Sequence, residues 1–294
     1  MKITEGYMPY LGYQTYYRIV GECRDGKKPL LLLHGGPGST HNYFEVLDRL
    51  AEEGRAIISY DQIGCGNSFV EGDHPELWTY ETWDNELIEL RKHLGLDEVH
   101  LLGQSWGGML IIEYLCNYHT EGVKSIILSS TLPSCQLWAE EQHRRIKFLP
   151  QEEQDAIARA EASGVYDDPM YLKAKDHFME WYCAAPVTED SPECLRRPKR
   201  SGTASYLATQ GDNEFAATGI FKTWEYRDRI GEIKEPSLII NGTNDLCTPL
   251  VAKTMYDAIP NAEWELFEDC RHMCFVEQND RYCRLLNEWM EKYD

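Results

Sequence analysis

Short apolar runs alternate with stretches of helical spacing along most of the chain, and this alternation predicts the elements of the fold. Apolar and β-branched runs predict strands at about 3–20, where a Gly-containing turn separates two segments, and at 30–33, 55–60, 98–102, 123–129, 237–241 and 263–267. Helical spacing covers 79–94, 106–118, 250–258 and 279–292. Because short apolar strands that alternate with helices are typical of parallel sheets covered on both faces, we expect an α/β fold with a mostly parallel central sheet.

The alternation stops between about 132 and 222. This part is helix-like with long polar faces, and a Pro- and Arg-containing segment follows the helical stretches at 186–200. The helical stretches lie at 140–147, 151–162 and 171–182. We therefore predict a core formed by 1–131 and 223–294, and a helical cap, 132–222, over the carboxyl edge of the sheet, where open α/β sheets bind ligands.

The charge of the chain excludes two classes of partner. Its 29 Lys and Arg residues against 49 Asp and Glu residues give a net charge of −20. Nucleic acid requires clustered cations, and an anionic membrane surface attracts basic segments, so neither partner is expected. No apolar run approaches the roughly 18 residues of a membrane-spanning helix, and the first residues lack the apolar region of a signal peptide. We expect a cytoplasmic protein.

The ten cysteines include no C-x-x-C pair. We interpret them as mostly buried free thiols in a reducing compartment, since the chain is not a small disulfide scaffold. Cys270 and Cys274, with His272 between them, offer an alternative interpretation as metal ligands. No second ligand pair follows at the spacing of a zinc site, so we expect no metal.

A candidate nucleophile lies in the pentapeptide GQSWG at 103–107, which matches G-x-S-x-G. A predicted strand precedes it and a predicted helix follows, which is the setting of a nucleophile elbow. Small glycines let the chain turn sharply and keep the Ser105 hydroxyl clear of neighbouring side chains. The alternative is a glycine-rich turn with a structural serine.

A serine nucleophile needs a base, and the base needs an acid that orients it. In this architecture the order along the chain is Ser, Asp or Glu, and His. Asp245 follows the strand that ends at 241, and His272 follows the strand that ends near 267. Of the nine histidines, His272 alone comes after the candidate acid. The candidate triad is Ser105, Asp245 and His272, with Asp269 as an alternative acid on the loop of His272.

Acyl transfer also needs donors that hold the developing oxyanion. The backbone N–H of Trp106 is one candidate, and the loop HGGPG at 34–38 supplies another through Gly36. His34 is expected to support this loop. The loop has an alternative interpretation as an anion-binding nest for a nucleotide. It lacks the Walker Lys-Ser/Thr pair and the Rossmann glycine spacing, so we expect no nucleotide and no other organic cofactor.

These motifs together resemble a known family. The segments HGGPGS at 34–39, DQIGCGNS at 61–68 and GQSWGG at 103–108 resemble the proline iminopeptidase family of α/β-hydrolases, and the chain is most similar to the branch of the tricorn-interacting aminopeptidase and the proline-specific peptidases. The resemblance continues through Asn213-Glu214-Phe215, Gly219 and Trp224 to Asp228-Arg229-Ile230. It implies the α/β-hydrolase fold with a helical cap, although the middle of the cap (about 135–200) matches poorly.

The resemblance also implies an activity. It implies a serine exopeptidase that releases an N-terminal residue, often proline, from small peptides through an aminoacyl-enzyme on Ser105. Glu214 would bind the α-ammonium of the substrate. Many family members carry a second glutamate just after the catalytic aspartate, and Leu246 stands at that position here.

Two alternatives remain open at this point. The same triad serves an amino-acid amidase or a carboxylesterase, and a non-catalytic protein of this fold would only bind a ligand. The expected partners are small peptides or aminoacyl amides with a free N-terminus. We expect a monomer or a small homo-oligomer.

Overall fold

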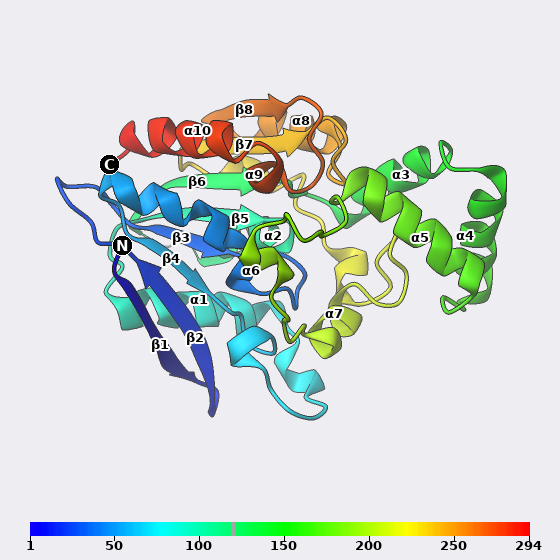
Figure 1. Ribbon diagram of the computed structural model, residues 1–294, viewed down its shortest axis with the longest axis horizontal. Helices are drawn as coiled ribbons and strands as arrows, with labels where there is room; N and C mark the ends of the chain where they lie inside the picture. Colours follow the sequence, from blue (N-terminus) through cyan, green and yellow to red (C-terminus); the bar gives the residue numbers. More distant parts are fainter. Residues whose placement is uncertain (119–120) are drawn as a thin grey trace.

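A single sheet runs through the part of the chain that the computed structural model describes, residues 1–118 and 121–294 (Figure 1). Its strands are β1 (Ile3–Tyr10), β2 (Tyr13–Val20), β3 (Leu30–Leu33), β4 (Ile57–Tyr60), β5 (Val99–Gln104), β6 (Val123–Ser129), β7 (Ser237–Gly242) and β8 (Ala262–Phe267). They lie in the order β1-β2-β4-β3-β5-β6-β7-β8. All neighbours from β4 to β8 are parallel, and β1 and β2 form an antiparallel hairpin at one edge.

Helices cover both faces of this sheet, which explains the apolar strands. Helices α1 (Tyr80–Leu94), α2 (Trp106–Tyr118) and α8 (Pro249–Ala258) contribute side chains to the core on one face, and η1 (His41–Glu53) and α10 (Asn279–Glu291) to the core on the other. Within β3, Leu31 and Leu33 belong to the first core, and Leu30 and Leu32 belong to the second. Four consecutive leucines are therefore all buried, and the expected α/β fold with a mostly parallel sheet is confirmed.

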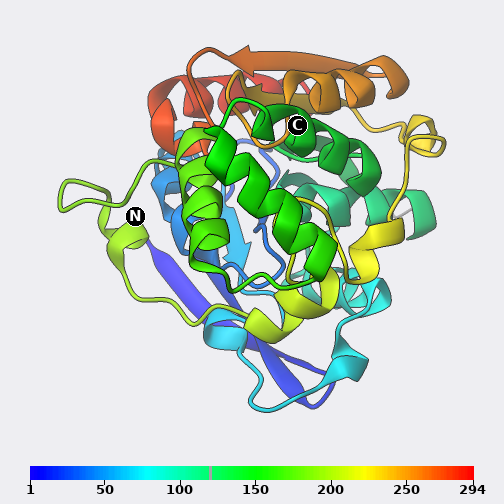
Figure 2. The same cartoon turned by 90° about the vertical axis from the view of Figure 1, so that its right-hand side faces the viewer.

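Between β6 and β7 the chain leaves the sheet and forms helices over its carboxyl edge. Figure 1 shows most of these helices on the right, with α6 nearer the middle, and in Figure 2 most of them lie in front of the sheet. They are α3 (Cys135–Ile146), α4 (Gln151–Ser163), α5 (Pro169–Tyr182), α6 (Glu193–Arg196), α7 (Thr203–Thr209) and the 3₁₀ turn η4 (Ile220–Thr223). Helices α3, α4 and α5 pack around a small apolar cluster, which we call the cap cluster and which Leu246 joins from the loop after β7. It consists of Ile146, Leu149, Ile157, Ala160, Tyr171, Ala174, Phe178, Phe215 and Leu246. The division at 132 and 222 stays a prediction.

Some bounds differ from the predicted ones for local reasons. Helix α3 begins at Cys135 rather than at 140, because the Ser134 side chain caps it by accepting a hydrogen bond from the Leu137 N–H. The 3₁₀ segment η1 and the short helices α6 and α7 have no predicted counterpart. The remaining short helices are η2 (Gly66–Ser68), η3 (Pro75–Leu77), η5 (Ile230–Glu232) and α9 (Cys274–Glu277). Within the described residues, every helix is too short or too polar to cross a membrane.

Candidate active site

Ser105 occupies the turn between β5 and α2, in a left-handed backbone conformation with φ of 55°. The turn is tightly packed: a Cβ at Gly103 would lie 2.2 Å from the Gly107 carbonyl oxygen, and one at Gly107 would lie 2.0 Å from the Leu33 carbonyl oxygen. The Ser105 carbonyl accepts a hydrogen bond of 2.7 Å from the Thr131 hydroxyl. Such a conformation persists only where its surroundings hold it, as these contacts do, and the Ser105 side chain reaches a cavity.

Asp245 and His272 meet on the loops after β7 and β8. The Nδ1 atom of His272 lies 2.7 Å from Oδ1 of Asp245, and Asp245 is fully buried. The Asp245 carboxylate also accepts hydrogen bonds from the N–H groups of Cys247, at 2.8 Å, and Gly242, at 3.2 Å. A carboxylate at Nδ1 assigns the proton to that nitrogen and leaves Nε2 as the acceptor. Asp269, the alternative acid, is exposed.

The loop at 34–38 lies beside Ser105. Gly36 has φ of 113°, and a Cβ there would lie 2.6 Å from the Gly38 nitrogen, so this position requires glycine. The Gly35 N–H donates to the Tyr43 hydroxyl, which donates in turn to Oε1 of Gln104, at 2.9 Å. This chain of hydrogen bonds ties the loop to the residue that precedes Ser105. Gly36 and Trp106 line the same cavity as Ser105 and His272.

His34 supports this loop as expected. Its Nδ1 lies 2.8 Å from the Gly35 carbonyl oxygen, and its Nε2 accepts a hydrogen bond of 3.0 Å from the Gln62 N–H. Burial lowers the pKa of His34 to about 4, so the ring is neutral at physiological pH. The Gln62 side chain accepts in turn from Nε1 of Trp106, at 2.8 Å. His34 therefore links the glycine loop to the loop after β4 and to the start of α2.

The metal interpretation of Cys270 and Cys274 gains no support from the geometry. Among residues 1–118 and 121–294, the groups of ligand-type side chains close enough to share an ion are His34–Asp61–Cys65 and Asp245–Cys247–His272. Neither group contains Cys270 or Cys274. Both ring nitrogens of His34 contact protein groups, and His272 is paired with Asp245.

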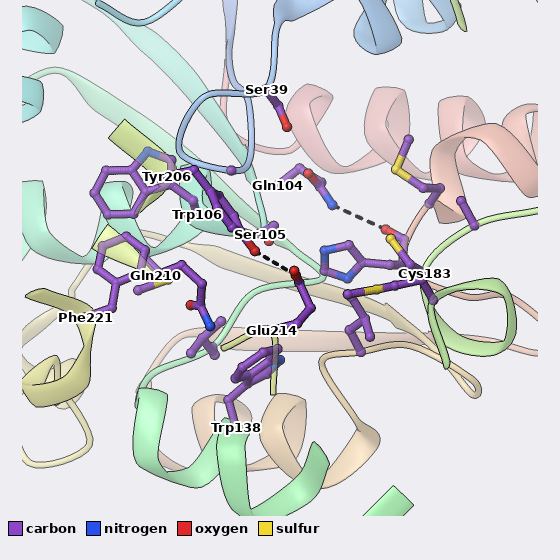
Figure 3. Close-up of a pocket in the computed structure, with 18 of the residues that line it drawn as sticks. Ser39, Gln104, Ser105, Trp106, Trp138, Cys183, Tyr206, Gln210, Glu214 and Phe221 are labelled. Carbon is purple, nitrogen blue, oxygen red and sulfur yellow. Dashed lines mark hydrogen bonds between the residues drawn. The ribbon is translucent and has the colours of Figure 1, made fainter. Parts of the chain in front are cut away.

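The cavity at the carboxyl edge of the sheet has a volume of about 380 Å³ and lies between the core and the cap (Figure 3). One wall is aromatic and apolar. The rings of Trp106 and Phe221 stack with their centroids 5.0 Å apart. Trp138, Met109 and Leu132 also line the cavity. The space beside Ser105 therefore suits a compact apolar side chain.

Glu214 lines the same cavity from the cap. The Tyr206 hydroxyl donates a hydrogen bond of 2.6 Å to its Oε1, drawn as a dashed line in Figure 3. The Glu214 N–H donates to the Tyr171 hydroxyl, at 3.3 Å. Burial, reinforced by the charge of Glu214, raises the pKa of Tyr206 well above its usual value. The hydroxyl therefore stays protonated and holds the carboxylate in place.

Leu246 contributes an apolar surface to the cavity. It is 7% exposed and belongs to the cap cluster together with Phe178 and Phe215. Its N–H donates to the Tyr182 carbonyl, at 3.1 Å. Among the described residues that line the cavity, Glu214 is the one with a carboxylate. The site therefore offers one anionic group to a ligand.

Besides the apolar wall, polar contributors were missed at the level of sequence, among them Tyr206, Gln210 and Arg145. Tyr206 and Gln210 line the cavity from α7 and the residue after it. The Arg145 guanidinium donates to the Asp245 carbonyl and lies over the Tyr182 ring, 4.4 Å from its centroid. Tyr206 and Gln210 are four positions apart, which is the one helical signal in this part of the sequence. A single interval of this kind is too short to predict a helix.

The nucleophile candidate lies in a strand–turn–helix at the carboxyl edge of a parallel sheet, beside a glycine-rich loop. This arrangement is typical of α/β-hydrolases. A family model described as alpha/beta hydrolase fold matches residues 28–278. Over the whole of both chains, the sequence is 63% identical to the proline iminopeptidase of Clostridium botulinum and 62% identical to that of Clostridioides difficile. The chain belongs to the proline iminopeptidase family of α/β-hydrolases.

Solved structures agree with this assignment. The proline iminopeptidase of Mycobacterium smegmatis superposes with a TM-score of 0.87 at 28% identity, covering 99% of this chain and 98% of that one. The structure named VinJ superposes with a TM-score of 0.90 at 28% identity, covering 99% of each chain. The resemblance seen in the sequence motifs is thus confirmed over the full length.

Proposed function

We propose that this protein is a serine aminopeptidase that releases an N-terminal residue, often proline, from small peptides or aminoacyl amides with a free N-terminus. The observation that carries the proposal is the position of Glu214, held by Tyr206 in the cavity that Ser105 and His272 also line. Proline iminopeptidases at 63% identity over the full length support the same activity.

The reaction uses groups of the chain alone. His272 Nε2 takes the proton of the Ser105 hydroxyl as its oxygen attacks the carbonyl carbon of the first residue. Asp245 orients the ring of His272 and stabilises its positive charge. The N–H groups of Gly36 and Trp106 hold the oxyanion of the tetrahedral intermediate. His272 then gives its proton to the leaving amine, and the aminoacyl ester remains on Ser105.

Hydrolysis of this ester repeats the same steps with water. His272 removes a proton from the water molecule as it attacks the ester carbonyl, and it returns the proton to the Ser105 oxygen when the amino acid leaves. No metal or organic cofactor enters this proposal, because the base, the nucleophile and the oxyanion donors are all protein groups.

Glu214 determines which peptide bond is cut. In a peptide, the α-ammonium and the first carbonyl are separated by a single carbon atom, so a carboxylate fixed near Ser105 places that carbonyl over the nucleophile. The wall of Trp106, Phe221 and Trp138 accommodates the side chain of the first residue. With Leu246 in place of a second carboxylate, one ion pair supplies the recognition of the amine.

The compartment, assembly and domain division complete the proposal. All ten cysteines are free, and eight of them are buried, which supports a reducing cytoplasm. We expect a monomer or a small homo-oligomer with a core of 1–131 and 223–294 and a cap of 132–222. Such a cap limits access to the site from the solvent.

The test compares proline p-nitroanilide with its N-acetylated form. We expect acetylation to abolish hydrolysis, because it removes the charge that Glu214 binds. Glu214→Gln is expected to lower kcat/KM for the free amine by about 10–100-fold, as for a charged hydrogen bond of 1.5–3 kcal/mol. Glu189→Gln, an exposed cap residue outside the cavity, is the matched control. Indifference to acetylation, or to Glu214→Gln, would favour the carboxylesterase alternative.

A further inference from the structure

Residues 197–202, which we call the strap, connect α6 to α7 (Figure 1) and contact the loops that carry Gly38 and Gly66. The Arg200 carbonyl accepts a hydrogen bond of 2.7 Å from the Gly66 N–H. The Gly202 N–H donates to the Gly38 carbonyl, at 2.8 Å. Gly38 ends the glycine loop that carries Gly36, so the strap contacts the loop assigned to the oxyanion.

The contact between the strap and this loop is backbone against backbone. A Cβ at Gly38 would lie 2.4 Å from the Gly202 carbonyl oxygen. A Cβ at Gly202 would lie 2.9 Å from the Gly38 Cα and 2.9 Å from the Gly64 carbonyl oxygen. The two segments therefore touch without intervening side chains, and any shift of one is transmitted to the other.

The other side of Gly202 reaches the carboxylate that binds the amine. The Gly202 carbonyl accepts hydrogen bonds from the Tyr206 N–H, at 3.0 Å, and from the Ser205 hydroxyl, at 2.8 Å, and these form the first turn of α7. The Tyr206 hydroxyl, one turn further on, holds Glu214. Gly202 thus connects the oxyanion loop to the helix that carries Tyr206, the residue that holds Glu214.

Side chains fix the strap to the core on its outer side. Arg197 donates two hydrogen bonds to the Glu45 carboxylate, at 2.8 and 3.2 Å. The Arg200 guanidinium lies over the Phe69 ring, 3.4 Å from its centroid, and pairs with Glu71. These contacts tie a segment without regular secondary structure to η1 and to the loop after η2.

We propose that the strap is a positioning element that sets the separation between the oxyanion loop and Glu214. A substrate reaches both groups at once only when its amine and its carbonyl are one carbon atom apart. The strap therefore adds to the selection of the first peptide bond, and Gly202 is its positioning residue. This inference rests on the proposed aminopeptidase function.

Gly202→Ala tests the strap directly. The φ of Gly202 is −83°, which alanine adopts without strain, so the added methyl group acts as a steric wedge. It would lie 2.9 Å from the Gly38 Cα and from the Gly64 carbonyl oxygen, and 2.8 Å from the Ser205 hydroxyl oxygen, whose side chain must turn away. The readout is the ratio of kcat/KM for proline p-nitroanilide to kcat/KM for p-nitrophenyl acetate, which has no amine. Since a displacement of 1 Å can cost about 100-fold in rate, we expect this ratio to fall at least about tenfold.

Two further variants make the result decisive. Gly231→Ala is the matched control, because its Cβ would meet nothing closer than the Ala258 carbonyl oxygen, at 3.3 Å, and it should keep the wild-type ratio. Glu45→Gln removes the ion pair that links Arg197 to the core while leaving its pair with Glu193, and it should lower the ratio about two- to threefold. If Gly202→Ala does not fold, the ratio for Glu45→Gln decides. An unchanged ratio in a folded variant overturns the inference.

The same measurements separate this inference from the function on which it rests. If the wild-type protein hydrolyses free and N-acetylated proline p-nitroanilide equally well, the proposed function fails and the inference falls with it. If the wild-type protein requires the free amine, and Gly202→Ala folds and keeps the wild-type ratio, the aminopeptidase proposal stands and the strap alone is wrong.

Discussion

Asp84 is a buried carboxyl group on α1 that weakens the protein at neutral and alkaline pH. It is 1% exposed, and its Oδ1 has no hydrogen-bond partner in the part of the chain that the structure describes. Burial, together with the charges of Glu113 and Glu81, raises the pKa of Asp84 to about 9. The folded protein therefore holds a proton there that the unfolded chain has released above about pH 4.

The sign and size of the effect follow from linkage. Between about pH 4 and pH 9 the folded state binds one more proton at Asp84 than the unfolded state, so the free energy of unfolding falls as the pH rises. At pH 7 the solution is about 3 pH units above the pKa of Asp84 in the unfolded chain. Keeping the proton on Asp84 therefore lowers the free energy of unfolding by at most about 4 kcal/mol. Local relaxation and water entry lower the real cost of a buried charge, so we expect Asp84→Asn to stabilise by about 1–3 kcal/mol.

Urea unfolding of wild type and Asp84→Asn at about pH 5.5, 7 and 8.5 measures this effect. The advantage of the asparagine variant should grow with pH, by at most about 1.4 kcal/mol per unit. Asp73→Asn, at an exposed position, should give a small and nearly constant difference. The reasoning is refuted if the advantage of Asp84→Asn is the same at all three values, or if the variant becomes less stable than wild type as the pH rises.

Three further outcomes are expected. A fluorophosphonate probe should add one label to the wild-type protein and none to Ser105→Ala by intact mass, whereas an unlabelled wild type would support the non-catalytic alternative. Tyr206→Phe should raise KM for proline p-nitroanilide about tenfold with little change in kcat, since Glu214 loses a charged hydrogen bond; an unchanged KM would contradict this role. Leu246→Ala should lower the free energy of unfolding by about 2–3 kcal/mol in urea, because Leu246 packs in the cap cluster, and a change below about 0.5 kcal/mol would show that the cluster does not need it.

The sequence predicted those parts of the molecule that depend on local patterns. The leucine run of β3 is buried on both faces, so its hydrophobicity alone indicated a strand. Ser105 lies in a turn whose glycines are required by close backbone contacts, and those glycines are visible as a motif. Asp245 and His272 follow from chain order and from the shared edge of parallel strands, and the structure brings them to 2.7 Å.

Features that depend on distant contacts were not predictable. Segment η1 is amphipathic but forms a 3₁₀ helix, and no residue type in 41–53 marks that choice. The short helix α7 follows Gly202, whose N–H bonds to the Gly38 carbonyl more than 160 positions earlier in the chain, and no local pattern shows this contact. The binding role of Glu214 was inferred from the family resemblance alone. The residues next to it in the sequence do not show that Tyr206 holds its side chain inside the cavity.

The cavity between core and cap, with one carboxylate in its lining, also limits which polypeptides can be cleaved. Under the proposed function, a chain must insert a free N-terminal residue into about 380 Å³ of space before Ser105 can attack it. Folded proteins whose first residues are packed or modified cannot do so. A cell could therefore keep the enzyme active at all times, without an inhibitor or an inactive precursor, because the shape of the site already spares its other proteins.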